Sequence, residues 1–107
     1  MIEKLQIIQQ RFDEVSDLII QPDIIVDQKR YIQLNKEYKD LSVMVEKMNQ
    51  YKVLLSNHQE AEELLKFEKD EEMISMAKME IDSVKEKLPQ LEEEIKFLLI
   101  PKDPEDA

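Results

Sequence analysis

Glycine is entirely absent from this 107-residue chain. Tight turns, most β-hairpins and phosphate-cradling loops use glycine for positive φ angles or for close approach of the backbone. A chain without glycine turns rarely, through Asn, Asp or Pro, and every glycine-dependent phosphate-binding motif is excluded. Cysteine is also absent, which removes disulfides and thiolate metal sites and fits a reducing compartment.

Long hydrophobic runs are missing too. No apolar run approaches the roughly 18 residues of a membrane span, and no basic-then-apolar signal peptide opens the chain. We therefore expect a soluble, cytoplasmic protein with no membrane partner. The chain is 42% hydrophobic and 37% charged, a mixture too apolar for disorder and too charged for a compact α/β core. This composition favours one small domain of long helices, each with one buried stripe.

The net charge of −10 is distributed unevenly along the chain. Residues 1–56 contain 9 acids and 8 bases, whereas residues 57–107 contain 16 acids and 7 bases. An acidic second half repels phosphate backbones, so we expect it to make no direct contact with nucleic acid. A basic protein partner, or solubility alone, explains this charge better.

The apolar spacing predicts a first helix over residues 2–20, ended by Pro22, which disfavours a helical residue before it. Its coiled-coil-like stripe consists of Ile2, Leu5, Ile8, Phe12, Val15 and Ile19. The next residues, 23–26, are predicted to be a connector. Its three apolar members, Ile24, Ile25 and Val26, are expected to pack on the helices.

A second helix is predicted from the N-cap Asp27 to Phe67, because no helix breaker lies between them. Its stripe is mostly apolar and recurs every three or four positions, at Tyr31, Leu34, Tyr38, Leu41, Val45, Met48, Tyr51, Leu55, His58, Ala61 and Leu65. A helix of about 40 residues would be about 60 Å long. Such a length is rare in globular proteins and indicates an antiparallel coiled coil.

A third helix is predicted to follow a turn at residues 67–70, with Asp70 as its N-cap and Pro101 as its end. Its stripe is Met73, Ala77, Ile81, Val84, Leu88, Leu91, Ile95 and Leu98, a nearly perfect heptad pattern. The apolar phase does not slip at Pro89, so we predict one continuous, kinked helix. Three leucines are predicted to be buried between helices: Leu41, Leu88 and Leu91.

The predicted fold class is therefore all-α, with three long helices forming an antiparallel coiled-coil-like bundle. Residues 1–100 form the helical domain. Residues 101–107 contain two prolines among acids, which predicts an extended, semi-rigid linker. We interpret this linker as the start of a connection to downstream domains that this chain does not contain.

The chemistry-bearing residues do not combine into a site. His58 is the single histidine and is interpreted as a partly buried helix residue. Glu92, Glu93 and Glu94 are interpreted as a solvated helix face, because consecutive helical carboxylates diverge and cannot surround a cation. No nucleophile is paired with a base. We therefore predict no catalytic, cofactor-binding or metal-binding residues and no cofactor, and the sequence does not identify partner-binding residues.

The methionines allow two interpretations. One is an adaptable apolar groove that binds proteins, formed by Met44, Met48, Met73, Met76 and Met79. The other is a soft core, which methionines at helical spacing form more often. Tyr31, Tyr38 and Tyr51 lie on one stripe and are interpreted as core residues with hydroxyls at its edge.

Three stretches carry a family resemblance: "DQKRYIQLNKEYKDL" (residues 27–41), "EEMISMAKMEI" (residues 71–81) and "LLIPKDPEDA" (residues 98–107). Together they resemble the N-terminal domain of bacterial class I peptide chain release factors. The last stretch is the most specific, since it resembles the junction of the factor type that reads UAA and UAG. In that family the junction leads to a domain with a Pro-x-Thr codon-reading tripeptide and a catalytic Gly-Gly-Gln loop. Neither motif occurs here, because this chain contains neither threonine nor glycine.

The resemblance implies a helical docking domain of a factor that directs translation termination at UAA and UAG. The full-length factor would promote peptidyl-tRNA hydrolysis, and this fragment would carry no catalytic motif. The implied partners are the ribosome, a ribosomal protein at the base of the stalk, and the class II release factor GTPase. The alternative is a free-standing coiled-coil scaffold or a prefoldin-like chaperone subunit, which could use the same helices but would not need the "PKDPEDA" tail.

Overall fold

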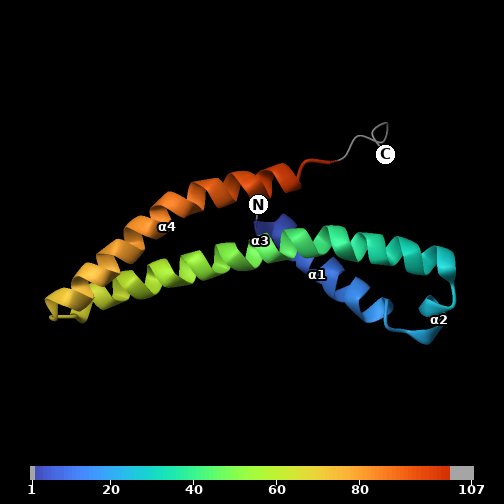
Figure 1. Ribbon diagram of the computed structural model, residues 1–107, viewed down its shortest axis with the longest axis horizontal. Helices are drawn as coiled ribbons and strands as arrows, with labels where there is room; N and C mark the ends of the chain where they lie inside the picture. The colour runs from blue at the N-terminus through green and yellow to red at the C-terminus, as the bar shows by residue number, and fades with distance from the viewer. Residues whose placement is uncertain (1, 102–107) are drawn as a thin grey trace. The chain divides into compact units, whose positions relative to one another are not determined.

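The computed structural model describes residues 2–101 of the chain. These residues contain no β-strand and form four helices, namely α1 (Ile2–Leu18), α2 (Pro22–Ile25), α3 (Gln28–Phe67) and α4 (Glu71–Leu98) (Figure 1). The all-α class and the three long helices are confirmed. The predicted linker lies outside the described residues except for Pro101. The chain divides into two compact units, Met1–Met48 and Asn49–Ala107, and α3 contributes to both.

The region around Pro22 differs from the prediction in two ways. Helix α1 ends at Leu18 rather than Ile20, and the backbone N–H of Gln21 closes the end by donating to the carbonyl of Leu18. The predicted connector is instead the short helix α2, because proline at the first helical position has its φ angle preset for a helix.

The helical turn of α2 also decides which apolar residue of the connector is buried. Successive residues in a helix point about 100° apart, so three in a row cannot share one core-facing side. Ile24 is buried as predicted, whereas Ile25 and Val26 are exposed. The expectation that all three pack on the helices was therefore wrong for two of them.

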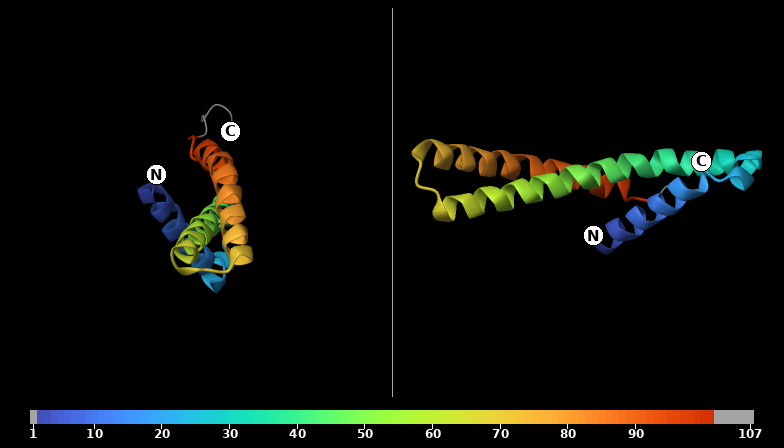
Figure 2. Two further views of the ribbon diagram at one scale, coloured as in Figure 1. Left: turned by 90° about the vertical axis from the view of Figure 1, so that its left-hand side faces the viewer. Right: turned by 90° about the horizontal axis from the view of Figure 1, so that it is seen from below.

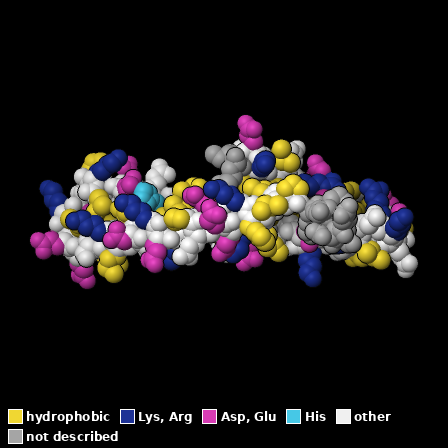
Figure 3. Space-filling view, turned by 90° about the horizontal axis from the view of Figure 1, so that it is seen from above, with side chains coloured by type: hydrophobic (Ala, Val, Ile, Leu, Met, Phe, Trp, Pro, Cys, Tyr) yellow, Lys and Arg dark blue, Asp and Glu magenta, His cyan; other side chains and the backbone are white. Residues whose placement is uncertain are grey.

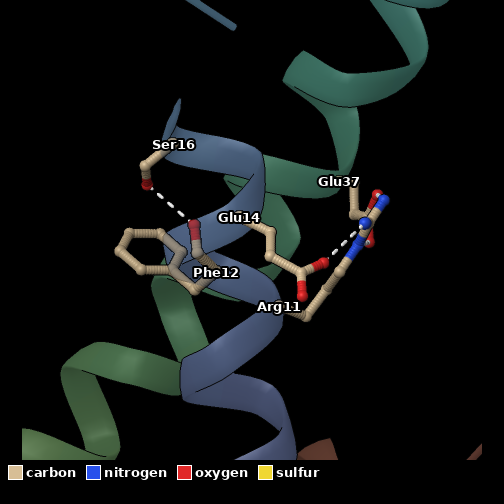
Figure 4. Close-up of polar contacts among 5 residues, drawn as sticks. All are labelled: Arg11, Phe12, Glu14, Ser16 and Glu37. Atoms are coloured by element: carbon tan, nitrogen blue, oxygen red, sulfur yellow. Dashed lines mark hydrogen bonds and ion pairs between the residues drawn. The ribbon is translucent and has the colours of Figure 1, made fainter. Parts of the chain in front are cut away.

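In the first unit, α1 and the first part of α3 run antiparallel (Figures 1 and 2). Val15, Ile24 and Leu34 form the buried cluster, and Leu18, Ile19, Tyr38 and Leu41 pack against it. The rings of Phe12 and Tyr38 stack with their centroids 5.0 Å apart, a separation at which aromatic pairs attract beyond their burial. The hydroxyl of Ser16 donates to the carbonyl of Phe12 at 2.8 Å, within α1 (Figure 4).

Polar side chains also connect α1 to α3 in this unit. Arg11 donates through Nε and Nη2 to the two carboxylate oxygens of Glu37, at 2.7 and 2.8 Å (Figure 4). Its Nη1 donates to Glu14 at 3.2 Å. This two-pronged contact matches the flat guanidinium to the flat carboxylate and fixes the two helices in register.

Both predicted N-caps are confirmed. Asp27 Oδ1 accepts from the backbone N–H of Arg30 at 3.3 Å, at the start of α3. Asp70 Oδ1 accepts from the backbone N–H of Glu72 at 3.1 Å, at the start of α4. Each cap satisfies an N–H that has no partner within the helix. The turn before α4 is held further by Glu68 Oε1, which accepts from the backbone N–H groups of Lys69 and Asp70.

In the second unit, the last part of α3 and α4 run antiparallel, side by side (Figures 1 and 2). Ala61, Ala77 and Ile81 form its buried cluster, with Leu64 and Leu65 packed against them. Helix α4 continues through Pro89 without interruption, as predicted; the kink there stays a prediction.

The predicted stripes mark most of the core. Five stripe residues of α4 are buried, namely Ala77, Ile81, Val84, Leu91 and Ile95. Leu41 and Leu88, which were predicted to be buried, are only partly so. Four stripe residues are exposed, which contradicts the prediction: Tyr31, Leu55, Met73 and Leu98. A stripe of heptad spacing drifts by about 20° per heptad around a straight helix, so some members turn away from the neighbouring helix.

Candidate docking surface

The single histidine lies on α3 in the second unit. His58 is partly buried, as predicted, and its Nε2 lies 3.4 Å from Glu62 Oε1, one helical turn further along. This spacing is that of an ordinary stabilising pair on a helix surface. The structure therefore places His58 as a helix residue beside Glu62, and the prediction that it has no catalytic role stays a prediction.

The glutamate run on α4 resembles the solvated face that was predicted. Glu93 and Glu94 are exposed, Glu92 is partly buried, and Glu93 Oε1 lies 3.7 Å from Lys96 Nζ. Within residues 2–101, no three His, Asp or Glu side chains converge closely enough to hold a metal ion. The prediction that the chain has no catalytic, cofactor or metal residues stays a prediction.

The methionines separate into two groups. Met44 and Met48 on α3 are buried, in agreement with a soft core. Met73, Met76 and Met79 on α4 are instead 42%, 65% and 68% exposed, so the core interpretation was wrong for these three. Met76 and Met79 lie away from the Ala77–Ile81 side that α4 offers to α3, so they face solvent. Met73 shares that side but lies in the first turn of α4, one turn before the buried cluster.

Two of the exposed methionines border an open groove in the second unit. The groove has a volume of about 430 Å³ and lies between the end of α3 and the start of α4. Its lining residues are Asn57, Glu60, Ala61, Leu64, Met73, Met76, Ala77 and Glu80. Among the apolar lining residues, Ala61 and Ala77 belong to the buried cluster and Leu64 packs against it, whereas Met73 and Met76 are exposed.

The groove carries negative charge. Its only ionisable lining residues are Glu60 and Glu80, one from each helix. Residues 57–80 contain eight acids and three lysines. Figure 3 shows hydrophobic side chains among acidic and basic ones at the left-hand end of the molecule, where α3 leads into α4. An apolar surface with an acidic rim can hold an apolar side chain and attract a cationic one.

Sequence reasoning found this groove only in part. The methionine spacing supported a protein-binding groove as the second interpretation. No pattern in the sequence, however, indicated that Leu64, Glu60 and Glu80 belong to the same surface. They come together through the turn at residues 67–70, which brings Ala61 of α3 into one buried cluster with Ala77 of α4. The sequence feature that could have located this groove is the position of that turn, because it determines which residues of the two helices lie near one another.

The first unit contains a paired arginine and glutamate, Arg11 and Glu37. The hydrogen bonds from Arg11, helped by its positive charge, lower the pKa of Glu37, while partial burial opposes this shift. The same hydrogen bonds raise the pKa of Arg11. The pair therefore remains ionised at neutral pH. Its role is to hold α1 on α3, since both groups are occupied by each other.

None of the helices in the described part of the chain is both long and apolar enough to cross a membrane.

Comparison with known proteins gives a consistent family signal. Residues 8–107 match the family model described as the PCRF domain. The chain is 60% identical over all 107 residues to peptide chain release factor 1 of Flavobacterium psychrophilum, and 59% identical to that of Flavobacterium johnsoniae. It is 50% identical to peptide chain release factor 1 of Bacteroides fragilis. The chain spans only 29–30% of the length of these relatives. No solved structure matches the chain.

Proposed function

Because the chain belongs to the PCRF domain family, we propose that it forms the N-terminal helical domain of a peptide chain release factor. The observation that carries this proposal is the 60% identity to peptide chain release factor 1 of Flavobacterium psychrophilum over the whole chain. The "LLIPKDPEDA" junction, which resembles that of the UAA- and UAG-reading type, supports termination at those two codons. The free-standing scaffold is set aside, since family membership explains both the helices and the tail.

The role within termination is docking rather than chemistry. Hydrolysis of peptidyl-tRNA by the family depends on a Gly-Gly-Gln loop, and this chain has no glycine. The acidic residues 57–107 favour contact with proteins over contact with RNA. We therefore assign the chain to positioning a cytoplasmic release factor on the ribosome, against a stalk-base ribosomal protein and the class II GTPase that recycles the factor.

A release assay tests the proposal with three proteins: the 107-residue chain, a full-length factor that carries it, and that factor with residues 1–107 deleted. We expect no peptide release by the chain alone and efficient release by the full-length factor. The deletion should retain some hydrolysis but bind ribosomes more weakly and respond less to the class II GTPase. Measurable hydrolysis by the chain alone would refute a purely docking role.

A further inference from the structure

The groove between α3 and α4 has the composition of a recognition surface for a helix. We propose that it binds a basic amphipathic helix of a protein partner, with the partner's apolar side chains on Leu64, Met73 and Met76 and its lysines or arginines against Glu60 and Glu80. This inference deepens the docking role proposed above and rests on it for the biological setting. The observation that carries it is that apolar residues and two glutamates line one groove in the second unit.

The apolar lining supplies the attraction. Single exposed hydrophobic residues are common and need no explanation. Here, however, two exposed methionines line the same groove as Leu64, Ala61 and Ala77. Methionine is unbranched and polarisable, so it adapts to side chains of different shapes and is overused at surfaces that accept helices. Covering Met73 and Met76 would remove this apolar area from water, which favours binding.

The geometry favours a helical partner over an extended one. An extended peptide usually gains affinity by adding a strand to a sheet edge. The described part of the chain contains no strand, and the backbone N–H and C=O groups in the interiors of α3 and α4 are paired within each helix. A partner must therefore bind through side chains, and a helix offers apolar residues at i, i+3 and i+4 that fit a groove between two helices.

Charge decides which helix fits. Glu60 and Glu80 are the ionisable groups of the groove, and the surrounding residues 57–80 are strongly acidic. A second copy of this chain has a net charge of −10 and would be repelled, as would a nucleic acid. A helix rich in lysine and arginine is attracted to this acidic surface. Its positively charged side chains lie near Glu60 and Glu80, and its apolar face contacts Met73 and Met76.

The test uses the 107-residue chain with isotope-labelled methionine methyl groups, since its six methionines give separate reporters. The probe is an amphipathic helical peptide of leucine and lysine, about 14 residues or about 21 Å long. The matched peptide has glutamate in place of lysine. We expect the leucine–lysine peptide to shift the methyl signals of Met73 and Met76 and to leave those of Met44 and Met48 unchanged. The leucine–glutamate peptide should shift none of them.

Matched variants distinguish binding in the groove from nonspecific hydrophobic binding elsewhere on the chain. Met76→Ser should weaken binding of the leucine–lysine peptide about tenfold, the loss expected for one well-buried apolar side chain. Met79→Ser is the control, because Met79 is as exposed and lies on the same helix but does not line the groove. The double variant Glu60→Gln, Glu80→Gln should also weaken binding, whereas Glu86→Gln on the same helix as Glu80 should not.

Three results would overturn the inference: equal loss of binding in Met76→Ser and Met79→Ser, equal binding of the two peptides, or shifts induced by a short RNA instead. Circular dichroism of each variant checks that its helices remain formed. The binding is measured without ribosomes, so its failure would leave the release assay unaffected. Likewise, a failed release assay would contradict the proposed function without changing the result of the peptide titration.

Discussion

Arg11 on α1 holds Glu37 on α3 through two parallel hydrogen bonds of 2.7 and 2.8 Å. The two residues are 26 positions apart, and their side chains are 40% and 37% exposed. The contact therefore sets the register between two helices at a site that water still reaches. Solvent screening limits its contribution to stability, while its geometry limits how α1 can slide along α3.

A double-mutant cycle should measure this pair. We expect Arg11→Ala and Glu37→Ala to show a coupling free energy below about 1 kcal/mol in urea unfolding, the range of exposed ion pairs. The matched pair is Lys66 and Glu63, which lie 3.3 Å apart and are 65% and 61% exposed. Its coupling should be smaller, because the contact is single and more exposed. Equal coupling in both cycles would mean that the two-pronged geometry adds nothing.

The same pair predicts a pH dependence. The pKa of Glu37 is lowered in the folded state by its hydrogen bonds from Arg11. Its stabilising effect should therefore be fully present above the ordinary glutamate pKa of about 4.3, and lost as the pH falls through the lower folded-state value. The free energy of unfolding of the native chain minus that of Glu37→Gln should shrink over this acidic range. A difference that is constant from neutral to acidic pH would contradict the assignment.

Truncation to alanine should lower the free energy of unfolding by different amounts at two neighbouring leucines of α4. Leu91 is buried and Leu88 is only partly buried. Leu91→Ala should cost about 2–5 kcal/mol of unfolding free energy, because it removes apolar contacts and leaves a cavity. Leu88→Ala should cost clearly less. If thermal unfolding ranks the two variants in the opposite order, the register of α4 is wrong.

The start of α4 depends on a cap. Asp70→Ala should destabilise the chain by about 1 kcal/mol, since the backbone N–H of Glu72 loses its acceptor. Asp82→Ala in the middle of the same helix is the control, and it should be neutral or slightly stabilising because alanine favours helix interiors. Equal destabilisation by both changes, in urea unfolding, would argue against a specific capping role.

The helices themselves could be predicted from the sequence. The absence of breakers between Asp27 and Phe67 predicted α3 within one residue, because an unbroken 3/4 apolar spacing is a local property of the chain. Helix α2 was missed, since Pro22 both stops one helix and can start the next. Proline position alone does not separate these two roles.

Contacts between helices could not be predicted in the same way. Nothing in the spacing of α1 pairs Arg11 with Glu37, because that pairing depends on the path of the chain around Pro22. The exposure of Met76 depends similarly on which side α4 turns toward α3. A stripe predicts that a face is buried, whereas the rotation of each helix is decided by how all the side chains pack together.

A chimera tests the docking assignment most directly. In it, this chain replaces the matching 107 residues of peptide chain release factor 1 from Flavobacterium psychrophilum, to which it is 60% identical. The readouts are peptide release at a UAA codon and GTPase-assisted recycling, with the native factor and the deletion of that segment as references. We predict that the chimera matches the native factor in both and that the deletion falls short in ribosome binding and recycling. A chimera no better than the deletion would contradict the assignment of this chain as the docking domain.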